Sequence, residues 1–403
     1  MRAAGRPRRK GGDEHMREED REGRKGNNAV IKFLKREPIF VISALAAIAS
    51  CFFVPPDREY LKYIDLRTLA LLYSLMAVVA ALRGAGAFES LAHAVCSRAK
   101  NTLSLGALLT ALAFFSSMLI TNDVALLTFV PFTVLLLGMT GRRRDMIFII
   151  VLQTVAANLG SMLTPVGNPQ NLYLYSYYSF SAGSFFRVTA PVWLFSLVMT
   201  AVLCLLIRPE RLQPELGGSE RPDGKKLAVY AALFAVCLLA VFRVIPWPAM
   251  LGAVIIVLFI FDRKALLKPD FMLLLTFAAF FVFAGNLARL AAVERLLRRM
   301  LSGREYLTAL LTSQVISNVP AALLLSGFTD NSRGLLLGVN AGGLGTPIAS
   351  LASLISLKLY SRTEGARTGK YLLVFILVNV LMLALITLFI FIWSLLGLLS
   401  AGD

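Results

Sequence analysis

The sequence predicts an all-α polytopic membrane protein, built as an inverted-topology repeat with two re-entrant hairpins and two interrupted transmembrane helices. Three observations lead to this prediction. Of the 403 residues, 57% are hydrophobic and only 16% are charged, which is more apolar surface than one soluble core of this length could bury. The apolar residues form blocks that approach the roughly 20 residues needed to span a bilayer. Two sets of these blocks are interrupted by the same polar pattern.

The charges lie mainly in the N-terminal tail and in the short connections, although the formal net charge of +17 is high. This distribution is typical of the positive-inside rule, so we expect the lipid bilayer as a partner and no nucleic acid. The four cysteines, Cys51, Cys96, Cys204 and Cys237, lie in or beside apolar runs without metal-ligand spacing. We expect no disulfide. We also expect no cofactor, apart from a bound sodium ion or a transported proton.

The chain divides into four predicted segments. Residues 1–37 read as a disordered, basic, cytoplasmic tail, 38–208 as the first transporter repeat and 209–226 as a cytoplasmic linker. Residues 227–398 hold an extra linking helix and then the second, inverted repeat. The basic excess directly before the first span places the N-terminus in the cytoplasm of a multi-pass protein of the plasma (inner) membrane. The tail also contains acids and precedes a full-length span, so a cleaved signal peptide is not expected.

Nine ordinary spans are expected, at 38–54, 64–82, 145–175, 188–207, 227–243, 246–262, 270–285, 332–360 and 371–398. Residues 101–139 do not fit as one span, because a straight helix of that length would reach roughly 58 Å. A break at Thr121, Asn122 and Asp123 would turn this run into a hairpin that enters and leaves by one face. Residues 303–328 show the same shape, with a break at Ser317 and Asn318. Non-helical backbone at that depth requires protein or a water-filled cavity around it.

Counting crossings puts 208–226 and 262–268 at the cytoplasmic face, where basic residues such as Lys268 agree with it. Residues 286–304 fall on the outer face despite five arginines. We interpret this stretch as an amphipathic interfacial helix that matches 86–99 in the first half. Arg83, which precedes 86–99, and Arg289, which lies within 286–304, are expected at the interface.

Two polar patterns recur in the same order. Ile120-Thr121-Asn122-Asp123-Val124-Ala125-Leu126-Leu127 aligns with Ile316-Ser317-Asn318-Val319-Pro320-Ala321-Ala322-Leu323, and Asn-x-Gly-x-x-x-Thr-Pro starts at both Asn158 and Asn340. The extra crossing 227–243 would make the second copy run in the reverse direction. Paired helix interruptions at corresponding positions are the best sequence pointer to a transporter's substrate site.

The chemistry of these interruptions suits a small ion. Gly and Pro break the helix and free backbone groups; half-helix N-termini favour anions, and freed carbonyls with Asn or Thr oxygens suit sodium. The alternative, that small residues only permit close helix packing, is weaker for two matched sets. Asp123 has no counterpart in the second half, where Val319 stands. Its carboxylate either handles an ion or proton or caps the following helix through backbone N–H groups.

At these motifs the chain resembles the ion transporter superfamily, which includes divalent-anion/sodium symporters, citrate transporters, arsenite permeases and one class of sodium–proton antiporters. The resemblance covers about residues 38–398 and is most specific at 121–127 and 158–171. It implies that the hairpin tips Thr121, Asn122, Ser317 and Asn318 bind substrate and sodium, as paired Ser-Asn-Thr tips do in the dicarboxylate branch. It also implies a homodimer. The third tip position departs from that pattern in both copies, and an acid there would repel an anion unless it is protonated or paired with a cation.

The predicted substrate and ion site combines both motifs, with sodium near Asn122, Asp123 and Asn318. Its members are Thr121, Asn122, Asp123, Asn158, Gly160, Ser161, Thr164, Pro165, Gly167, Asn168, Asn171, Ser317, Asn318, Asn340, Gly342, Gly343, Thr346 and Pro347. The first half, with Asp123, is expected to dominate ion coupling.

The leading hypothesis is a secondary active transporter of a small anion or oxyacid, inorganic or carboxylate, coupled to a proton or sodium gradient by alternating access. The alternative is a sodium–proton antiporter that uses Asp123 and carries no anion. A channel fits matched broken helices poorly. We expect no enzyme, because no nucleophile–base or paired-acid set lies near the motifs and no phosphate-cradling Gly-Lys-Ser/Thr loop occurs.

Overall fold

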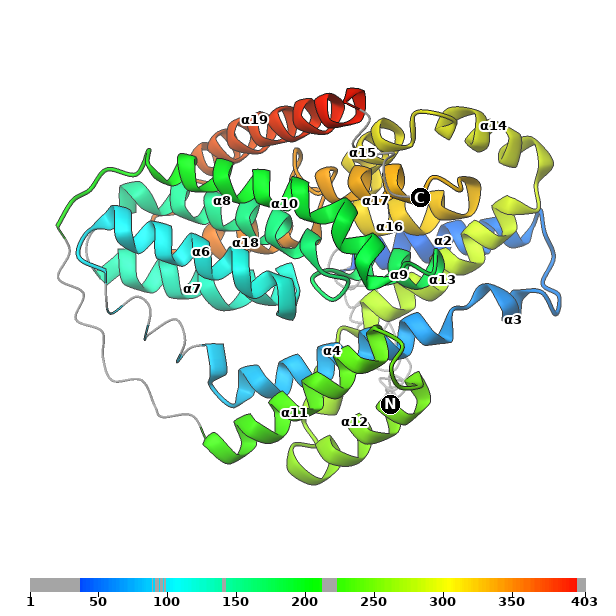
Figure 1. Cartoon of the computed structure of the whole chain (residues 1–403), viewed down its shortest axis with the longest axis horizontal. Helices are drawn as coiled ribbons and strands as arrows, with labels where there is room; N and C mark the ends of the chain where they lie inside the picture. The colour runs from blue at the N-terminus through cyan, green and yellow to red at the C-terminus, as the bar shows by residue number, and fades with distance from the viewer. Residues whose placement is uncertain are drawn as a thin grey trace, which may run out of the picture.

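Helices form all the regular secondary structure in the described part of the chain (Figure 1). The computed structural model describes residues 37–88, 99–139, 143–211 and 223–396, and a few residues between 89 and 98. The predicted tail up to residue 36, half of the predicted 86–99 segment and most of the 209–226 linker therefore lie outside the described residues. The all-α prediction is confirmed.

In the first half the elements are α2 (Pro38–Cys51), α3 (Tyr60–Tyr63), α4 (Leu66–Gly84), α6 (Thr102–Ile120), α7 (Asn122–Met139), α8 (Arg143–Gly160), η1 (Ser161–Leu163), α9 (Pro169–Tyr177) and α10 (Ala182–Cys204). The second half contains α11 (Gly224–Val241), α12 (Trp247–Phe261), η2 (Ala265–Leu267), α13 (Phe271–Ala288), α14 (Ala291–Leu301), α15 (Glu305–Ile316), α16 (Asn318–Leu325), η3 (Ser326–Phe328), α17 (Ser332–Ala341), α18 (Leu351–Ser361) and α19 (Thr368–Leu395).

Seven stretches of the described chain are long and apolar enough to cross a bilayer, in α4, α6, α8 with η1, α10, α11, α13 and α19. The shorter apolar helices include α7, α16 with η3, and α18. These short pieces are hairpin arms and half-helices, because the chain breaks between α6 and α7, between α15 and α16, and on both sides of the Thr-Pro segments. Both predicted hairpins and both interrupted helices are therefore present at the predicted positions.

One predicted boundary is wrong. The span expected from residue 188 begins six residues earlier, at Ala182, because Ser181 caps α10 by accepting the backbone N–H of Ser184 (3.1 Å). The sequence carries this signal as a serine at the N-cap position. The apolar block alone had suggested a later start.

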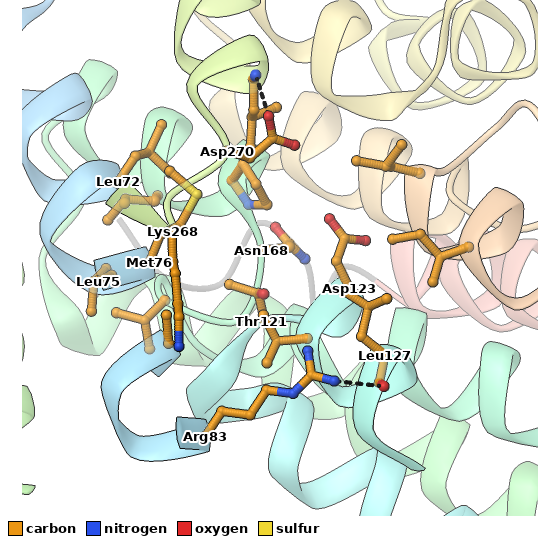
Figure 2. Close-up of a pocket in the computed structure, with 18 of the residues that line it drawn as sticks. Leu72, Leu75, Met76, Arg83, Thr121, Asp123, Leu127, Asn168, Lys268 and Asp270 are labelled. Carbon is orange, nitrogen blue, oxygen red and sulfur yellow. Dashed lines mark hydrogen bonds between the residues drawn. The ribbon is translucent and has the colours of Figure 1, made fainter. Parts of the chain in front are cut away.

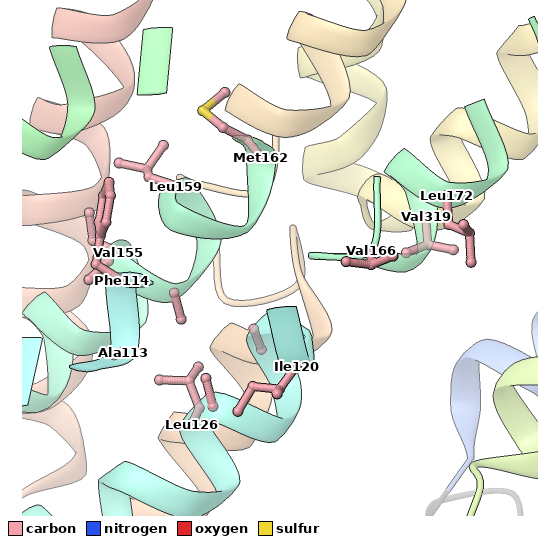
Figure 3. Packing of buried hydrophobic residues seen from close by; sticks show 14 of the residues in the cluster. Ala113, Phe114, Ile120, Leu126, Val155, Leu159, Met162, Val166, Leu172 and Val319 are labelled. Carbon is pink, nitrogen blue, oxygen red and sulfur yellow. The ribbon is translucent and has the colours of Figure 1, made fainter. Parts of the chain in front are cut away.

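The helices form two groups (Figure 1). The hairpin α6–α7 packs against α8, and α10, α18 and α19 complete this bundle. Helix α4 packs against α11 and α12 below the bundle, and α13 packs along α2. Buried apolar side chains fill the space around the first hairpin and the interrupted helices, among them Phe114, Leu126, Leu159 and Met162 (Figure 3).

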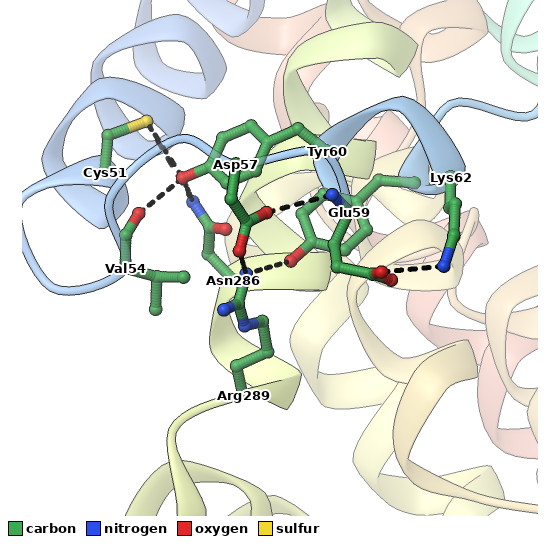
Figure 4. A network of polar contacts seen from close by, with 9 residues as sticks. Cys51, Val54, Asp57, Glu59, Tyr60, Lys62, Asn286 and Arg289 are labelled. Carbon is green, nitrogen blue, oxygen red and sulfur yellow. Dashed lines mark hydrogen bonds and ion pairs between the residues drawn. The ribbon is translucent and has the colours of Figure 1, made fainter.

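A polar network joins α2, α3 and the end of α13 (Figure 4). The Asn286 amide donates to the hydroxyls of Tyr60 (2.7 Å) and Ser50 (2.9 Å), and Arg289 forms an ion pair with Asp57 (2.8 Å). The network connects residues 54–60 with residues 286–289, which crossing counts assign to the same outer face. The Arg243 side chain donates to the carbonyl of Tyr175 (3.3 Å). The backbone N–H of Thr102 donates to the carbonyl of Glu210 (2.9 Å). In each pair the two residues lie at ends of spans that the crossing count assigns to the same face, so both contacts agree with the predicted order of crossings.

Candidate functional site

The two hairpin tips share one backbone conformation. Thr121 (φ 67°, ψ 147°) and Ser317 (φ 74°, ψ 155°) both have positive φ, a costly conformation for a side chain other than glycine and one that clusters at ligand sites. It turns the next residue out of the first arm. The backbone N–H of Asn122 then donates to the Gly167 carbonyl (3.1 Å), and that of Asn318 donates to the Ala349 carbonyl (2.9 Å). Each tip is therefore fastened to the Thr-Pro segment of its own half.

The two Thr-Pro segments also attach to equivalent points on the first hairpin arms. The Thr164 hydroxyl donates to the carbonyl of Met118, and the Thr346 hydroxyl donates to that of Gln314 (3.3 Å). Met118 and Gln314 each lie three residues before a tip. The two halves therefore share these hydrogen bonds as well as the polar sequence pattern.

The half-helices that follow are capped in the same way by different residues. The Asn168 side chain accepts the N–H of Asn171 (2.9 Å) at the start of α9, where Pro169 occupies the first helical position. At the start of α18, Ser350 accepts the N–H of Ser353 (3.1 Å). Asn and Ser are both strong N-cap residues. Ser350 and Ser353 therefore take the places of Asn168 and Asn171, although the residue types differ.

At the broken helices, an asparagine from each half forms hydrogen bonds with capping residues of the other half. Asn158, from the first half, accepts hydrogen bonds from Asn122 (3.0 Å) and from Ser350 (3.1 Å), the cap of the second half. Asn340, from the second half, accepts from Asn168 (3.2 Å), the cap of the first half. Asn340 also donates to the Asn171 side chain (2.7 Å). Each half thus supplies the asparagine that holds the broken helix of the other.

Glycines permit this approach. A Cβ at Gly160 would overlap the Phe114 carbonyl and lie 2.7 Å from the Ser117 hydroxyl. At the matching position a Cβ on Gly342 would lie 2.7 Å from the Ser313 side chain, and one on Gly343 would lie 2.9 Å from the Asn318 amide. Such distances are too short for any larger residue, so these three positions require glycine for close packing. Their participation in ligand binding through backbone groups stays a prediction.

A cavity of about 550 Å³ opens beside the first tip (Figure 2). Of the predicted site residues, Thr121, Asp123 and Asn168 line it. Most of the others form the buried framework behind it, while Thr346 is exposed and Pro347 is half-buried. The framework members are Asn122, Asn158, Gly160, Ser161, Thr164, Pro165, Gly167, Asn171, Ser317, Asn318, Asn340, Gly342 and Gly343.

Asp123 is half-buried in the wall of this cavity. Its backbone N–H donates to the Asn122 side chain (3.0 Å), but among the described residues no hydrogen bond or ion pair reaches its carboxylate. The capping alternative required backbone N–H donors to that carboxylate, and the described residues supply none. An acid at this depth with no partner among the described residues is costly, and an intramembrane acid of this kind is by default a candidate site for ion or proton handling.

Three further charged residues line the cavity, and sequence reasoning missed all of them (Figure 2). Arg83 is half-buried at the end of α4, and Lys268 and Asp270 are exposed at the mouth. Arg83 had been expected at the membrane interface and Lys268 had been explained by the positive-inside rule. Only the fold shows that residues 83, 123 and 268, which are far apart in sequence, surround one space.

Arg83 is positioned by a proline. Pro131 lies inside α7 and has no N–H to donate to the carbonyl of Leu127, four residues earlier. The Arg83 guanidinium takes up this carbonyl instead (3.1 Å). The charge is therefore held at the cavity wall by a backbone defect in the same hairpin arm that begins at Asp123.

A resident metal centre finds no support in the side chains: the described residues contain no group of three or more His, Cys, Asp and Glu that could hold a metal ion. Near the predicted sodium position, the Asn122 side-chain oxygen already accepts a hydrogen bond. That oxygen keeps a second lone pair, so a sodium ion there would draw on Asn122, Asp123 and hairpin carbonyls.

These features define a polytopic membrane transporter of anions or similar solutes. The chain belongs to the citrate transporter family, whose model matches residues 30–332. It is 31% identical to the inner membrane protein YbiR of Escherichia coli over 336 residues, which is 82% of this chain and 89% of that protein. It is also 31% identical to the uncharacterized transporter MJ0456 of Methanocaldococcus jannaschii over 78% of this chain and 86% of that protein. A shorter match, 31% over 42% of this chain and 34% of the relative, is to the silicon efflux transporter LSI3 of Oryza sativa.

Proposed function

We propose that the chain is a secondary active transporter that moves a small anion or oxyacid against its gradient, coupled to protons or sodium ions. Membership of the citrate transporter family supports an anionic substrate, and the relative named for silicon efflux supports the inclusion of oxyacids. The paired broken helices support alternating access around a site between the halves.

One observation carries the coupling proposal, namely that the carboxylate of Asp123 lies in the cavity beside a hairpin tip with no hydrogen-bond or ion-pair partner among the described residues. A proton or a sodium ion on Asp123 would remove the charge that otherwise repels an anion. Binding of the cation would therefore favour binding of the substrate in the same cavity. A carrier whose loaded and empty forms differ in this way can couple the two gradients.

The cavity lies between α4 and the start of α13 on one side and the hairpin α6–α7, α9 and α18 on the other. Movement of the bundle against α4 would open it to one face and then to the other. We place the N-terminus in the cytoplasm of the plasma membrane, so that Arg83 and Lys268 lie toward the cytoplasmic end. Labelling of single cysteines introduced at 142–144 tests this orientation, since reagents confined to the outside should not reach them.

Uptake into proteoliposomes tests the function. Purified protein should accumulate a labelled anion or oxyacid only under an inward proton or sodium gradient, and an ionophore that dissipates the gradient should abolish accumulation. Sodium–proton exchange without uptake of any anion or oxyacid would instead establish the antiporter alternative. Downhill flux that ignores both gradients would refute coupling.

A further inference from the structure

The charged side chains that line the cavity do not form ion pairs with one another in the described part of the chain. Among the described residues, no ion pair joins Arg83, Asp123, Lys268 or Asp270, although all four line the same space. Asp270 accepts the N–H of Leu273 (3.0 Å) as the cap of α13, and Arg83 gives one N–H to Leu127. A guanidinium carries five N–H donors in a planar fork, so Arg83 retains donors for a ligand.

The two cations come from different elements but meet at one end of the cavity. The Lys268 ammonium lies beside Gly84, 3.5 Å from where a Cβ on that residue would sit, and Gly84 directly follows Arg83. In the view of Figure 2, the ends of Arg83 and Lys268 lie below the carboxylates of Asp123 and Asp270. Lys268 is exposed and Arg83 is half-buried, so the pair leads from the mouth into the cavity.

The charge of the cavity then depends on Asp123. Two cations and two carboxylates balance while Asp123 is ionised and empty. A single coupling cation on Asp123 leaves one positive charge in excess, carried inside the cavity by Arg83. One negative charge on the substrate restores the balance, whereas a second would have to be desolvated without a partner.

The rest of the wall is mostly apolar. Side chains from α4, α7 and α9 supply it, including Leu72, Leu75, Met76, Val124 and Leu172. A small inorganic oxyanion needs donors on several sides, but the described wall groups its charged donors at Arg83 and Lys268. A ligand with one anionic end and a hydrocarbon body matches the wall, and a space of about 550 Å³ has the size of a small-molecule site.

We propose that the cavity binds an organic monocarboxylate, with its carboxylate on Arg83 and its hydrocarbon part against α4 and α7, after a cation has bound Asp123. This inference rests on the proposed function and narrows its substrate class. Arg83 is assigned as the residue that recognises the carboxylate. Lys268, at the mouth, attracts the anion toward it.

Binding to the purified full-length protein tests the assignment. The assay is run with excess sodium at neutral pH and again at acidic pH, so that either coupling cation can occupy Asp123. Under at least one of these conditions hexanoate should bind at least 10-fold more tightly than hexanamide, which has the same body without the charge, and more tightly than succinate or phosphate. Arg83→Gln should weaken hexanoate binding by about 10- to 100-fold, which corresponds to the loss of hydrogen bonds between charged groups. Arg83→Lys should retain part of the affinity. Lys268→Gln should weaken binding less, and its effect should fade at high salt because its site is solvent-exposed.

Arg289→Gln is the matched control, because Arg289 pairs with Asp57 outside the cavity, and its hexanoate affinity should equal that of the wild type. Equal binding of hexanamide and hexanoate, or unchanged hexanoate binding by Arg83→Gln, would overturn the inference. Tighter binding of neutral arsenous acid than of hexanoate would overturn it as well. Gradient-driven accumulation of arsenous acid would then leave the transporter proposal standing, whereas gradient-independent flux of every solute would refute the transporter proposal itself.

Discussion

The hydrogen bonds that Asn158 and Asn340 form across the two halves predict how the free energy of unfolding responds to substitution. Asn340 is 2% exposed and holds the cap of α9 through Asn168 and Asn171. Asn340→Ala removes the acceptor of the Asn168 amide, which still donates to the Ser161 hydroxyl (3.1 Å). It also removes the donor to the Asn171 side-chain oxygen, for which the described residues offer no replacement. One buried acceptor is therefore orphaned.

The magnitude follows from this count. An orphaned buried acceptor costs about 1–3 kcal/mol, and the small void left by the missing amide adds about 1 kcal/mol. We expect the free energy of unfolding to fall by about 2–4 kcal/mol. The loss of stability should affect α9, which belongs to the first repeat, although Asn340 belongs to the second.

Asn379→Ala is the matched control. Asn379 is also fully buried in a long helix. Within the described part of the chain, its side-chain oxygen has no hydrogen-bond partner and its amide donates only to the Phe375 carbonyl of its own helix (2.9 Å). The same substitution should therefore cost less than about 1 kcal/mol there. Titration with SDS in mixed micelles measures both free energies of unfolding. An equal cost for the two substitutions would refute the proposed role of these hydrogen bonds between the halves.

Three other predictions follow from single contacts. Pro131→Ala should restore the helical hydrogen bond to the Leu127 carbonyl and release Arg83 from it. The thermal midpoint should then rise while the affinity for hexanoate falls. A fall in both quantities would contradict this role of Pro131. Gly160→Ala should cost about 1–3 kcal/mol by overpacking, measured as a lower thermal midpoint, whereas Gly252→Ala in α12, where a Cβ meets no atom, should be neutral or stabilising. The Arg289 guanidinium holds the pKa of Asp57 below its ordinary value of 3.8. A carboxylate whose pKa is lower in the folded than in the unfolded state stabilises the fold at pH values above its unfolded pKa. This contribution to stability is lost as the pH falls through the pKa of the folded state. Asp57→Asn should therefore lower the thermal midpoint slightly at pH 7, and the difference from the wild type should shrink as the pH falls below the ordinary value of 3.8. A difference that grows in acid would oppose the assignment.

Much of the fold could be predicted from the sequence because membrane segments obey few rules. The run 101–139 is too long for one helix, and the polar triplet that begins at Thr121 interrupts it near its middle. Apolar length and helix breakers are local properties, so they located both hairpins and both interrupted helices. The start of α10 failed because hydropathy is averaged over a window, while the cap at Ser181 is a single residue.

The candidate site was predicted less completely, for a physical reason. The repeated motif found the framework, since Asn158 and Asn340 each hold a broken helix of the other half. It did not find the walls of the cavity, because Arg83 and Lys268 look like ordinary basic residues at membrane borders. Their role depends on the packing of α4 and α13 beside the first hairpin, which no local pattern encodes. The link from Pro131 to Arg83 could have been suspected, since a proline in a helix always frees a carbonyl.

The most direct test of the central claim compares Asp123→Asn with Asp270→Asn in proteoliposomes. Both acids line the cavity, but Asp270 caps α13 at the mouth, whereas Asp123 has no described partner. If Asp123 couples transport to a cation, Asp123→Asn should abolish gradient-driven accumulation of the solute while exchange of that solute across the membrane persists. Asp270→Asn should retain accumulation. Accumulation by Asp123→Asn with an unchanged dependence on the sodium and proton gradients would contradict the claim that this carboxylate couples transport to a cation.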